Sequence, residues 1–237
     1  MDRKRILPLA WLPFLMLFLT ACLRSASSPA PTSVSAFENP APTSVPFPLA
    51  LASTWIYEYR AYDENKQALW IVTETIVAAE ERDGLLVAEV ERLIRLQEGQ
   101  PGNGLANAPE DGISWYILRG ADLFRQYGAL DSGDLLKNAS LEMVFPPESV
   151  PCWPLDEASS PLERGAAGCR SVSNSLPTYE TPAGVFENCI ELVTPYPGGD
   201  IQTVFCPDIG FVAQEYDHNS SKSGYTFTLV GYSLPLP

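Results

Sequence analysis

Histidine is the scarcest residue with useful chemistry in this chain, which has one, His218, among 237 residues. Catalytic arrangements of the Ser-His-Asp or Cys-His kind need a histidine, so either would depend on this single side chain. His218 lies in the polar stretch YDHNSSKSG, which is typical of a solvated hairpin turn. The sequence also lacks a G-x-S-x-G motif, a phosphate-binding glycine loop and a dinucleotide fingerprint. These absences predict a protein that is not an enzyme, has no catalytic residues and needs no cofactor.

Basic residues are few as well. The chain has 15 lysines and arginines against 29 aspartates and glutamates, a formal net charge of −14 at pH 7. A surface this acidic repels phosphate backbones, which argues against nucleic acid as a partner. Two acidic clusters could supply paired carboxylates for glycoside hydrolysis: Glu80, Glu81 and Asp83, and Asp131 and Asp134. Both clusters fall at predicted turns, where carboxylates are solvated, so an extracytoplasmic hydrolase is kept only as an alternative.

Long apolar runs are absent after residue 21. The one such run, residues 6–21, carries no charge, follows three basic residues at positions 3–5 and ends in the small residues Thr20 and Ala21. Its 16 residues are fewer than the ~20 needed to cross a bilayer, and two prolines weaken it as a helix. A basic stub, an apolar stretch and a small-residue end make up a secretory signal, so we predict a signal peptide over residues 1–21.

The end of this run, Leu19-Thr20-Ala21-Cys22, resembles the lipobox of bacterial lipoproteins. The resemblance implies cleavage before Cys22, fatty acylation of its sulfur (a palmitate, for example) and an anchor that holds the protein to a membrane outside the cytoplasm. Two or three acyl chains give stable anchoring, because each buried methylene contributes about 0.8 kcal/mol. The plain alternative is a secreted protein in which Cys22 is an odd thiol.

Residues 22–50 are mostly Ser, Pro, Ala and Thr, and they contain the pentapeptide APTSV twice. Such a segment has too little apolar surface to offset its chain entropy, so we predict an extended tether. Residues 51–237 contain no second linker and are long enough for one domain with its own core. The predicted organisation is a signal peptide over 1–21, a lipidated tether over 22–50 and a single extracytoplasmic domain over 51–237.

The domain is predicted to be mainly β. TWIYEYRAY, from residue 54, places Trp55, Tyr57 and Tyr59 on one face. Residues 85–97 alternate too and follow an Asp-Gly turn, which favours an antiparallel meander, although their composition also suits a helix. ALWIVTETIVAAEE is apolar on both faces, which fits a central strand covered on both sides or the wall of an apolar concavity. Residues 129–183 look irregular, with a short helix near 134–141.

Four cysteines remain besides Cys22: Cys152, Cys169, Cys189 and Cys206. An even number in an exported chain suggests two disulfides, for which three connectivities exist. Folding VFENCIELV against IQTVFC pairs residues whose numbers sum to 395, which sets Cys189 opposite Cys206. Opposed strand residues lie ~4.5–5.5 Å apart, within reach of a disulfide. We therefore prefer Cys189–Cys206 with Cys152–Cys169, and we expect no metal site because no two cysteines have C-x-x-C spacing.

The same hairpin carries a second resemblance. TPAGVFENCIEL followed by VFCPDIGFVAQE is similar to a hairpin of many bacterial lipoproteins and secreted β-proteins, except that Asp208 stands where glycine is usual. The resemblance implies a strongly curved antiparallel sheet, half-barrel or clam-like, such as the LolA/LolB-type lipoprotein carriers have. Those carriers hold acyl chains in the concavity, and a shared fold alone does not transfer that function.

Together these features predict a non-enzymatic cell-envelope protein, anchored to a membrane through acyl chains on Cys22, that binds an apolar ligand or an envelope partner. The alternative is a structural or assembly lipoprotein without a ligand cavity. The sequence does not reveal the ligand-binding residues, the ligand or partner, the oligomeric state, or the leaflet that holds the anchor.

Overall fold

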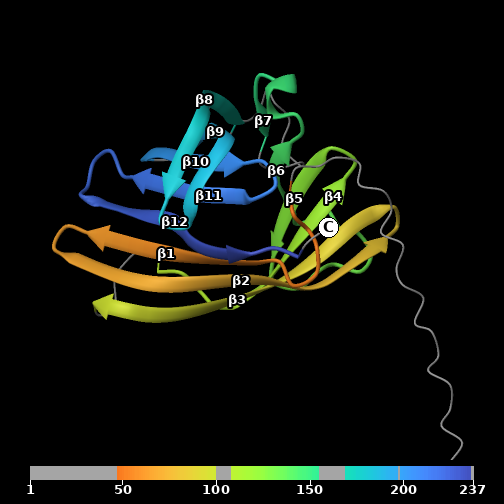
Figure 1. The fold of residues 1–237 in the computed structure, drawn as a ribbon, viewed down its shortest axis with the longest axis horizontal. Helices are drawn as coiled ribbons and strands as arrows, with labels where there is room; N and C mark the ends of the chain where they lie inside the picture. The colour runs from red at the N-terminus through yellow and green to blue at the C-terminus, as the bar shows by residue number, and fades with distance from the viewer. Residues whose placement is uncertain (1–46, 100–107, 155–168, 197, 236–237) are drawn as a thin grey trace, which may run out of the picture. The chain divides into compact units, whose positions relative to one another are not determined.

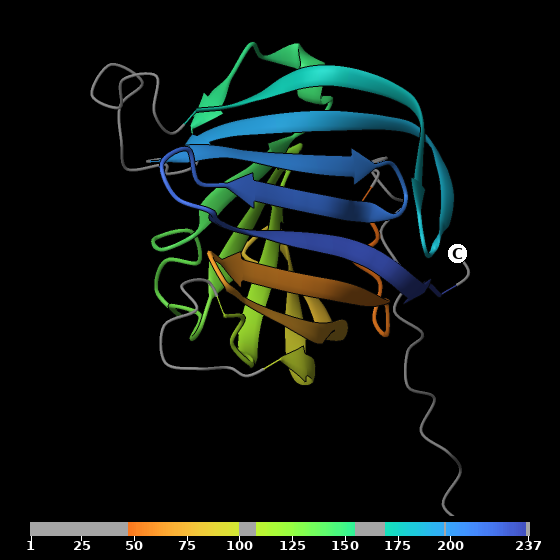
Figure 2. The same ribbon diagram turned by 90° about the vertical axis from the view of Figure 1, so that its left-hand side faces the viewer.

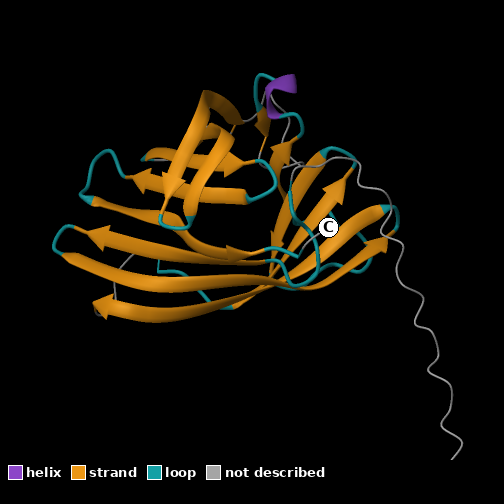
Figure 3. Cartoon of the chain, in the orientation of Figure 1, coloured by secondary structure: helices purple, strands orange, loops and turns teal. Residues whose placement is uncertain are grey.

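The computed structural model describes residues 47–99, 108–154, 169–196 and 198–235. These residues belong to one compact unit, Pro42–Pro237. Strands dominate it, and the single helix in these ranges is the 3-10 turn η1, Pro147–Ser149 (Figure 3). The prediction of a mainly β fold with few or no helices is confirmed. The predicted signal peptide, Cys22 and the tether as far as residue 46 lie outside the described residues.

In the described ranges, twelve strands form one antiparallel sheet in the order β6-β5-β4-β3-β2-β1-β12-β11-β10-β9-β8-β7 (Figure 1). Most strands lie beside their neighbours in the sequence, as a meander requires, whereas β1 and β12 join the two halves of the chain. The bounds are β1 Thr54–Asp63, β2 Lys66–Arg82, β3 Leu85–Gly99, β4 Gly112–Arg119, β5 Asp122–Tyr127, β6 Ser140–Val144, β7 Trp153–Pro154, β8 Cys169–Thr181, β9 Gly184–Tyr196, β10 Gly199–Cys206, β11 Gly210–Asp217 and β12 Ser223–Ser233.

The sheet is strongly curved, so that β4, β5 and β6 rise steeply across the end of the long strands β2 and β3 (Figures 1 and 2). Register shifts interrupt the pairing of β2 with β3 between Leu69 and Trp70 and between Ile76 and Ala78. Bulges of this kind bend a strand and increase its twist. The strands at the two ends of the sheet, β6 and β7, lie in contact, so the sheet nearly closes on itself. The predicted curved antiparallel sheet is therefore correct.

The core fills part of the concave side, and strand alternation decides which side chains enter it. Trp55 and Tyr57 of β1 and Val72 and Ile76 of β2 are buried there. The opposite face of β2 is not covered to the same extent, because Val77 is 43% exposed. Leu69 and Ile71 on that face are partly buried, so the predicted cover on both sides is only partial. The strand forms part of the concave wall.

The packed region begins before the predicted boundary at residue 51. Phe47 and Leu49 are both buried in the main hydrophobic core. The Phe47 ring lies 4.8 Å from Tyr116 and 6.3 Å from Phe205, measured between ring centroids. The last residues of the range 22–50 are thus part of the domain, because the ring of Phe47 packs among other aromatic rings of the core.

Two local expectations within residues 129–183 are wrong. A helix near 134–141 is replaced by successive turns, and β6 begins at Ser140. Asp134 Oδ1 accepts a hydrogen bond from the Leu136 amide (3.1 Å), a local bond that favours a turn over a helix. The second half of the supposed irregular region contains β8, in which only Arg170 and Thr181 are buried. Its polar residues pair with β9 through the backbone, which leaves little apolar alternation to detect.

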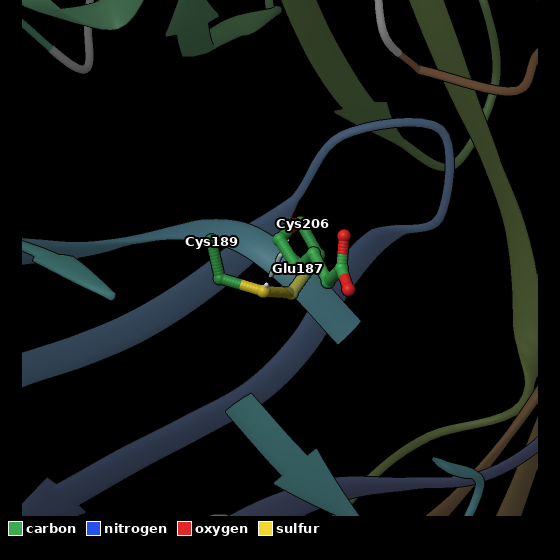
Figure 4. Close-up of a disulfide and its surroundings, with 3 residues drawn as sticks. All are labelled: Glu187, Cys189 and Cys206. Atoms are coloured by element: carbon green, nitrogen blue, oxygen red, sulfur yellow. Dashed lines mark hydrogen bonds between the residues drawn. A yellow bond between two sulfur atoms is a disulfide. The ribbon is translucent and has the colours of Figure 1, made fainter. Parts of the chain in front are cut away.

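The β9–β10 hairpin has the predicted register, with Ile190 opposite Phe205 and Leu192 opposite Thr203. The structure pairs the cysteines as the register predicted. Cys189 and Cys206 form a disulfide between these two strands, with Cα atoms 4.2 Å apart (Figure 4). Cys152 and Cys169 form the second, with Cα atoms 5.7 Å apart, next to the short pairing of β7 with β8.

Candidate functional site: a cavity on the concave face

A cavity of about 390 Å³ opens on the concave face of the sheet. Ten of the twelve described strands contribute side chains to its lining, all except β7 and β9. The segment 108–110, just before β4, adds to the lining at the rim, where Ala108 and Glu110 are exposed. Because neighbouring strands each point alternate residues inward, one curved sheet encloses the space without any helix.

One wall of the cavity is aromatic and belongs to β1 and β12. Tyr57 stacks on Phe227 with ring centroids 4.0 Å apart, and Tyr59 stacks on Tyr225 at 5.4 Å. The register explains the cluster, since Tyr59 is directly opposite Phe227 in the sheet. Phe211 of β11 continues this wall. Rings of this kind offer flat apolar faces to a ligand while the tyrosines keep a polar edge.

A second wall of the cavity contains a buried ion cluster centred on Glu74 of β2, the neighbour of β1 in the sheet. Its side chain is 3% exposed, and its Oε1 accepts hydrogen bonds from Arg92 Nε (2.8 Å) and Arg125 Nη2 (2.7 Å). Arg92 is opposite Glu74 on β3, whereas Arg125 comes from β5, on the steep part of the sheet. The curvature of the sheet is what brings these three side chains together.

Arg125 is fixed by several contacts. Its Nη1 donates to the Tyr116 hydroxyl (3.0 Å) and its Nη2 also donates to Ser114 Oγ (3.2 Å). Its guanidinium lies over the Tyr127 ring, 4.9 Å from the centroid. The Arg125 Nε is buried without a hydrogen-bond partner. A buried guanidinium with an unused donor is costly, and the bonds of its two terminal nitrogens to Glu74, Tyr116 and Ser114 offset part of that cost.

A third arginine, Arg170 of β8, lines the cavity and is only 7% exposed. Its Nε donates to Thr194 Oγ1 (2.9 Å), and its Nη1 donates to Glu142 Oε2 (2.8 Å) and to the Glu142 carbonyl (2.6 Å). Its remaining terminal nitrogen, Nη2, makes no hydrogen bond to any residue in the described ranges. The same is true of Arg92 Nη1 among those residues, because Glu74 occupies only Nε and Nη2 of that side chain.

The cluster fixes its own protonation. Burial alone would raise the pKa of Glu74, but the charges and hydrogen bonds of Arg125 and Arg92 lower it to about 2. Burial raises the pKa of Tyr116, and it raises the pKa of Tyr225 to about 12. At neutral pH the carboxylate is therefore charged, both arginines are charged, and these phenols remain hydrogen-bond donors. Glu74, Arg92 and Arg125 together carry one net positive charge.

The residues singled out from the sequence lie elsewhere. His218 is in the β11–β12 turn, where its Nδ1 accepts hydrogen bonds from the Ser220 and Ser221 amides (3.2 and 3.1 Å). Glu80 and Glu81 lie at the end of β2 and not in the predicted turn, and Glu80 pairs with Arg82. Asp83 is in the turn that follows, and Asp131 accepts a hydrogen bond from the Gly133 amide. None of these residues lines the cavity. No group of three or more His, Cys, Asp or Glu suited to a metal ion occurs in the part of the chain that the structure describes.

Sequence reasoning missed the ion cluster, although one signal was present. Glu74 lies on the same face of its strand as Trp70, Val72 and Ile76, which are buried. A carboxylate on a buried face needs a cationic partner, so its position predicts that arginines come to it. The sequence does not say which arginines, because Arg125 is 51 residues away.

Comparisons with known proteins found solved structures with a similar fold but no matching protein family. No protein-family model matches the sequence, and the comparison with curated proteins found no match. The fold is similar to a candidate lipoprotein from Parabacteroides distasonis ATCC 8503, with 13% sequence identity, a TM-score of 0.48, and 80% of this chain and 99% of that chain covered. It is also similar to a candidate exported protein with a YmcC-like fold from Bacteroides fragilis NCTC 9343, with 13% identity, a TM-score of 0.47, and 79% and 98% covered. No helix in the described ranges is long and apolar enough to cross a membrane.

Proposed function

We propose that this chain is a lipid-anchored, extracytoplasmic binding protein that holds a small ligand in the cavity on the concave face. The cavity carries the proposal. Its volume of about 390 Å³ falls in the range typical of small-molecule sites, and it combines an aromatic wall with a few placed polar groups. The lipobox at Leu19–Cys22 and two disulfides in one domain support a location outside the cytoplasm.

The lining also favours a more polar ligand than an acyl chain. The charged side chains of Glu74, Arg92 and Arg170 would be stripped of water by a purely apolar occupant, at a large electrostatic cost. An occupant with a flat apolar part and a polar group would contact both walls favourably. We therefore replace the apolar ligand predicted from the sequence by an amphiphilic one.

Binding without chemistry is the simplest use of this site. Glu74, the most buried carboxylate of the lining, has its pKa held near 2 by two arginines, so it is a poor proton acceptor at neutral pH. The arginines themselves stay protonated and act as fixed donors. These properties suit electrostatic recognition better than general acid–base catalysis.

Native mass spectrometry of the full-length protein, released from its own membranes in neutral detergent, tests the proposal. We expect a bound small molecule in addition to the mass of acyl chains on Cys22. The Gln214→Trp variant should lose the bound molecule, because Gln214 lines the cavity on β11 and an indole ring would fill it. Its matched control is Glu215→Trp, since Glu215 is exposed on the other face of the same strand and the ligand should be retained.

Two results would contradict the proposal separately. A protein without any bound molecule, in the wild type as in Gln214→Trp, would favour a structural or assembly lipoprotein. A wild-type mass that shows an uncut leader or an unmodified Cys22 would contradict the lipid anchor. It would have no bearing on ligand binding in the cavity.

A further inference from the structure

We propose that the ligand is a small organic anion, whose carboxylate or phosphate group binds Arg92 in the cavity while a flat ring lies against the aromatic wall of β1 and β12. This inference rests on the proposed function and names the chemical class of its ligand.

Two terminal arginine nitrogens of the cavity lining make no hydrogen bond to the described residues. Arg92 is the least buried of the three cavity arginines, with 20% of its side chain exposed, and its Nη1 is not bonded to any described residue. Arg170 contributes a second unused nitrogen to the same cavity. Guanidinium nitrogens donate hydrogen bonds and accept none, so the group that completes them is an acceptor, and an ionised one binds most strongly.

The charge of the Glu74 cluster also favours an anionic ligand. Two arginines share the single carboxylate of Glu74, so the cluster keeps one positive charge in a mostly buried place. The next carboxylate, Glu142, is already paired with Arg170, and Glu110 at the rim forms no ion pair within the described ranges. Burying an uncompensated charge is unfavourable, and an anionic ligand removes that cost on binding.

The aromatic wall alone would suit a cation equally well, since rings attract positive groups to their faces. The cavity is lined by three arginines, Arg92, Arg125 and Arg170, and by three glutamates, Glu74, Glu110 and Glu142. Glu74 and Glu142 are already paired with arginines, and Glu110 lies at the exposed rim, so the positive charge left over deeper in the cavity favours an anion over a cation there. The two walls together are complementary to a ring that carries a negative group.

Calorimetric titration of the full-length protein in neutral detergent provides the test. The probes are benzoate and benzamide, which share a ring and nearly the same size and differ in charge, with phenyl phosphate as the alternative anion. We expect benzoate or phenyl phosphate to bind at least about tenfold more tightly than benzamide, as a charge-assisted hydrogen bond gives. The Arg92→Met variant should lose that preference and keep the affinity for benzamide.

Arg92→Met leaves the Glu74–Arg125 pair in place, so the fold is expected to survive, and circular dichroism would verify it. Arg95→Met is the control on the same strand, because Arg95 is exposed and points to the opposite face. Equal affinities for benzoate and benzamide, or a preference that persists in Arg92→Met, would overturn the inference and leave the proposed function standing. Failure of every anionic probe to bind at millimolar concentration would overturn it as well. The proposed function fails by a different result, the absence of any bound molecule in protein isolated from its host.

Discussion

Glu74 shows how one side chain connects the fold to the site. It joins β2, β3 and β5 through Arg92 and Arg125, and it defines the charge of the cavity. Removing one partner of a buried ion pair is much more damaging than removing an exposed one, because the remaining charges stay buried without compensation. The consequence concerns both stability and its dependence on pH.

We expect Glu74→Gln to lower the free energy of unfolding by about 3–5 kcal/mol at pH 7. The folded-state pKa of Glu74 is lowered from 4.5 to about 2, so its stabilisation is fully present above pH 4.5 and is lost as the pH falls from 4.5 towards 2. Urea denaturation at a series of pH values should therefore show a steep acid loss in the wild type that is weaker in Glu74→Gln.

The control is Glu58→Gln, which breaks the exposed pair between Glu58 and Arg60 on the convex side of β1. Exposed pairs contribute about 0–1 kcal/mol, so this variant should resemble the wild type. A Glu74→Gln protein as stable as Glu58→Gln at pH 7 would show that the cluster is not buried as described.

Among the elements, the β9–β10 hairpin was predictable from sequence and its surroundings were not. Its register follows from local alternation and from two cysteines that must meet, both of which are visible in about 20 residues. β8 was not recognised, because most of its residues are polar and only two are buried, although its backbone pairs with β9 along most of its length. The cavity was hidden for another reason: its residues come from ten strands, and only the curvature of the sheet brings them together.

The two disulfides allow a direct comparison at this scale. Each joins cysteines 17 residues apart, so the chain-entropy model gives each the same restriction of the unfolded chain, worth about 3 kcal/mol. We expect Cys152→Ser/Cys169→Ser to lower the free energy of unfolding by about this amount and Cys189→Ser/Cys206→Ser to lower it further, because the second pair is buried and its serines would bury two hydroxyl groups; guanidinium denaturation under oxidising conditions measures both. An unchanged stability of Cys152→Ser/Cys169→Ser would mean that native contacts, and not the unfolded chain, determine the effect.

At the scale of the whole domain, Phe47 near the N-terminal boundary stabilises the packing of the two halves of the sheet. Phe47 lies among Trp55, Tyr116, Phe205 and Phe211, which come from four strands in both halves of the sheet. Two of these rings, those of Tyr116 and Phe211, also line the cavity, so Phe47 supports its floor. The composition of residues 22–50 indicated a tether and concealed this contact, because the burial of one ring depends on partners far away in the sequence.

We expect Phe47→Ala to cost about 3–5 kcal/mol in the free energy of unfolding, since truncating a buried phenylalanine leaves a hole that the sheet cannot close. Leu51→Ala is the control from the same segment, because Leu51 is 58% exposed and should change stability by less than about 0.5 kcal/mol. Chemical denaturation of the two variants decides the matter, and equal midpoints would show that the domain begins after residue 50.

The position of Phe47 has a mechanical consequence. Any tension applied to the chain N-terminal to this residue reaches the domain first at a ring held by both halves of the sheet, and not at the end of β1. Gly210, with a φ of +102°, is in contact with that ring. A Cβ at this position would lie only 3.2 Å from the ring, so the absence of a side chain lets the ring pack closely against the backbone. We therefore expect unfolding under such tension to require removal of the Phe47 ring from its aromatic neighbours before β1 separates from the sheet.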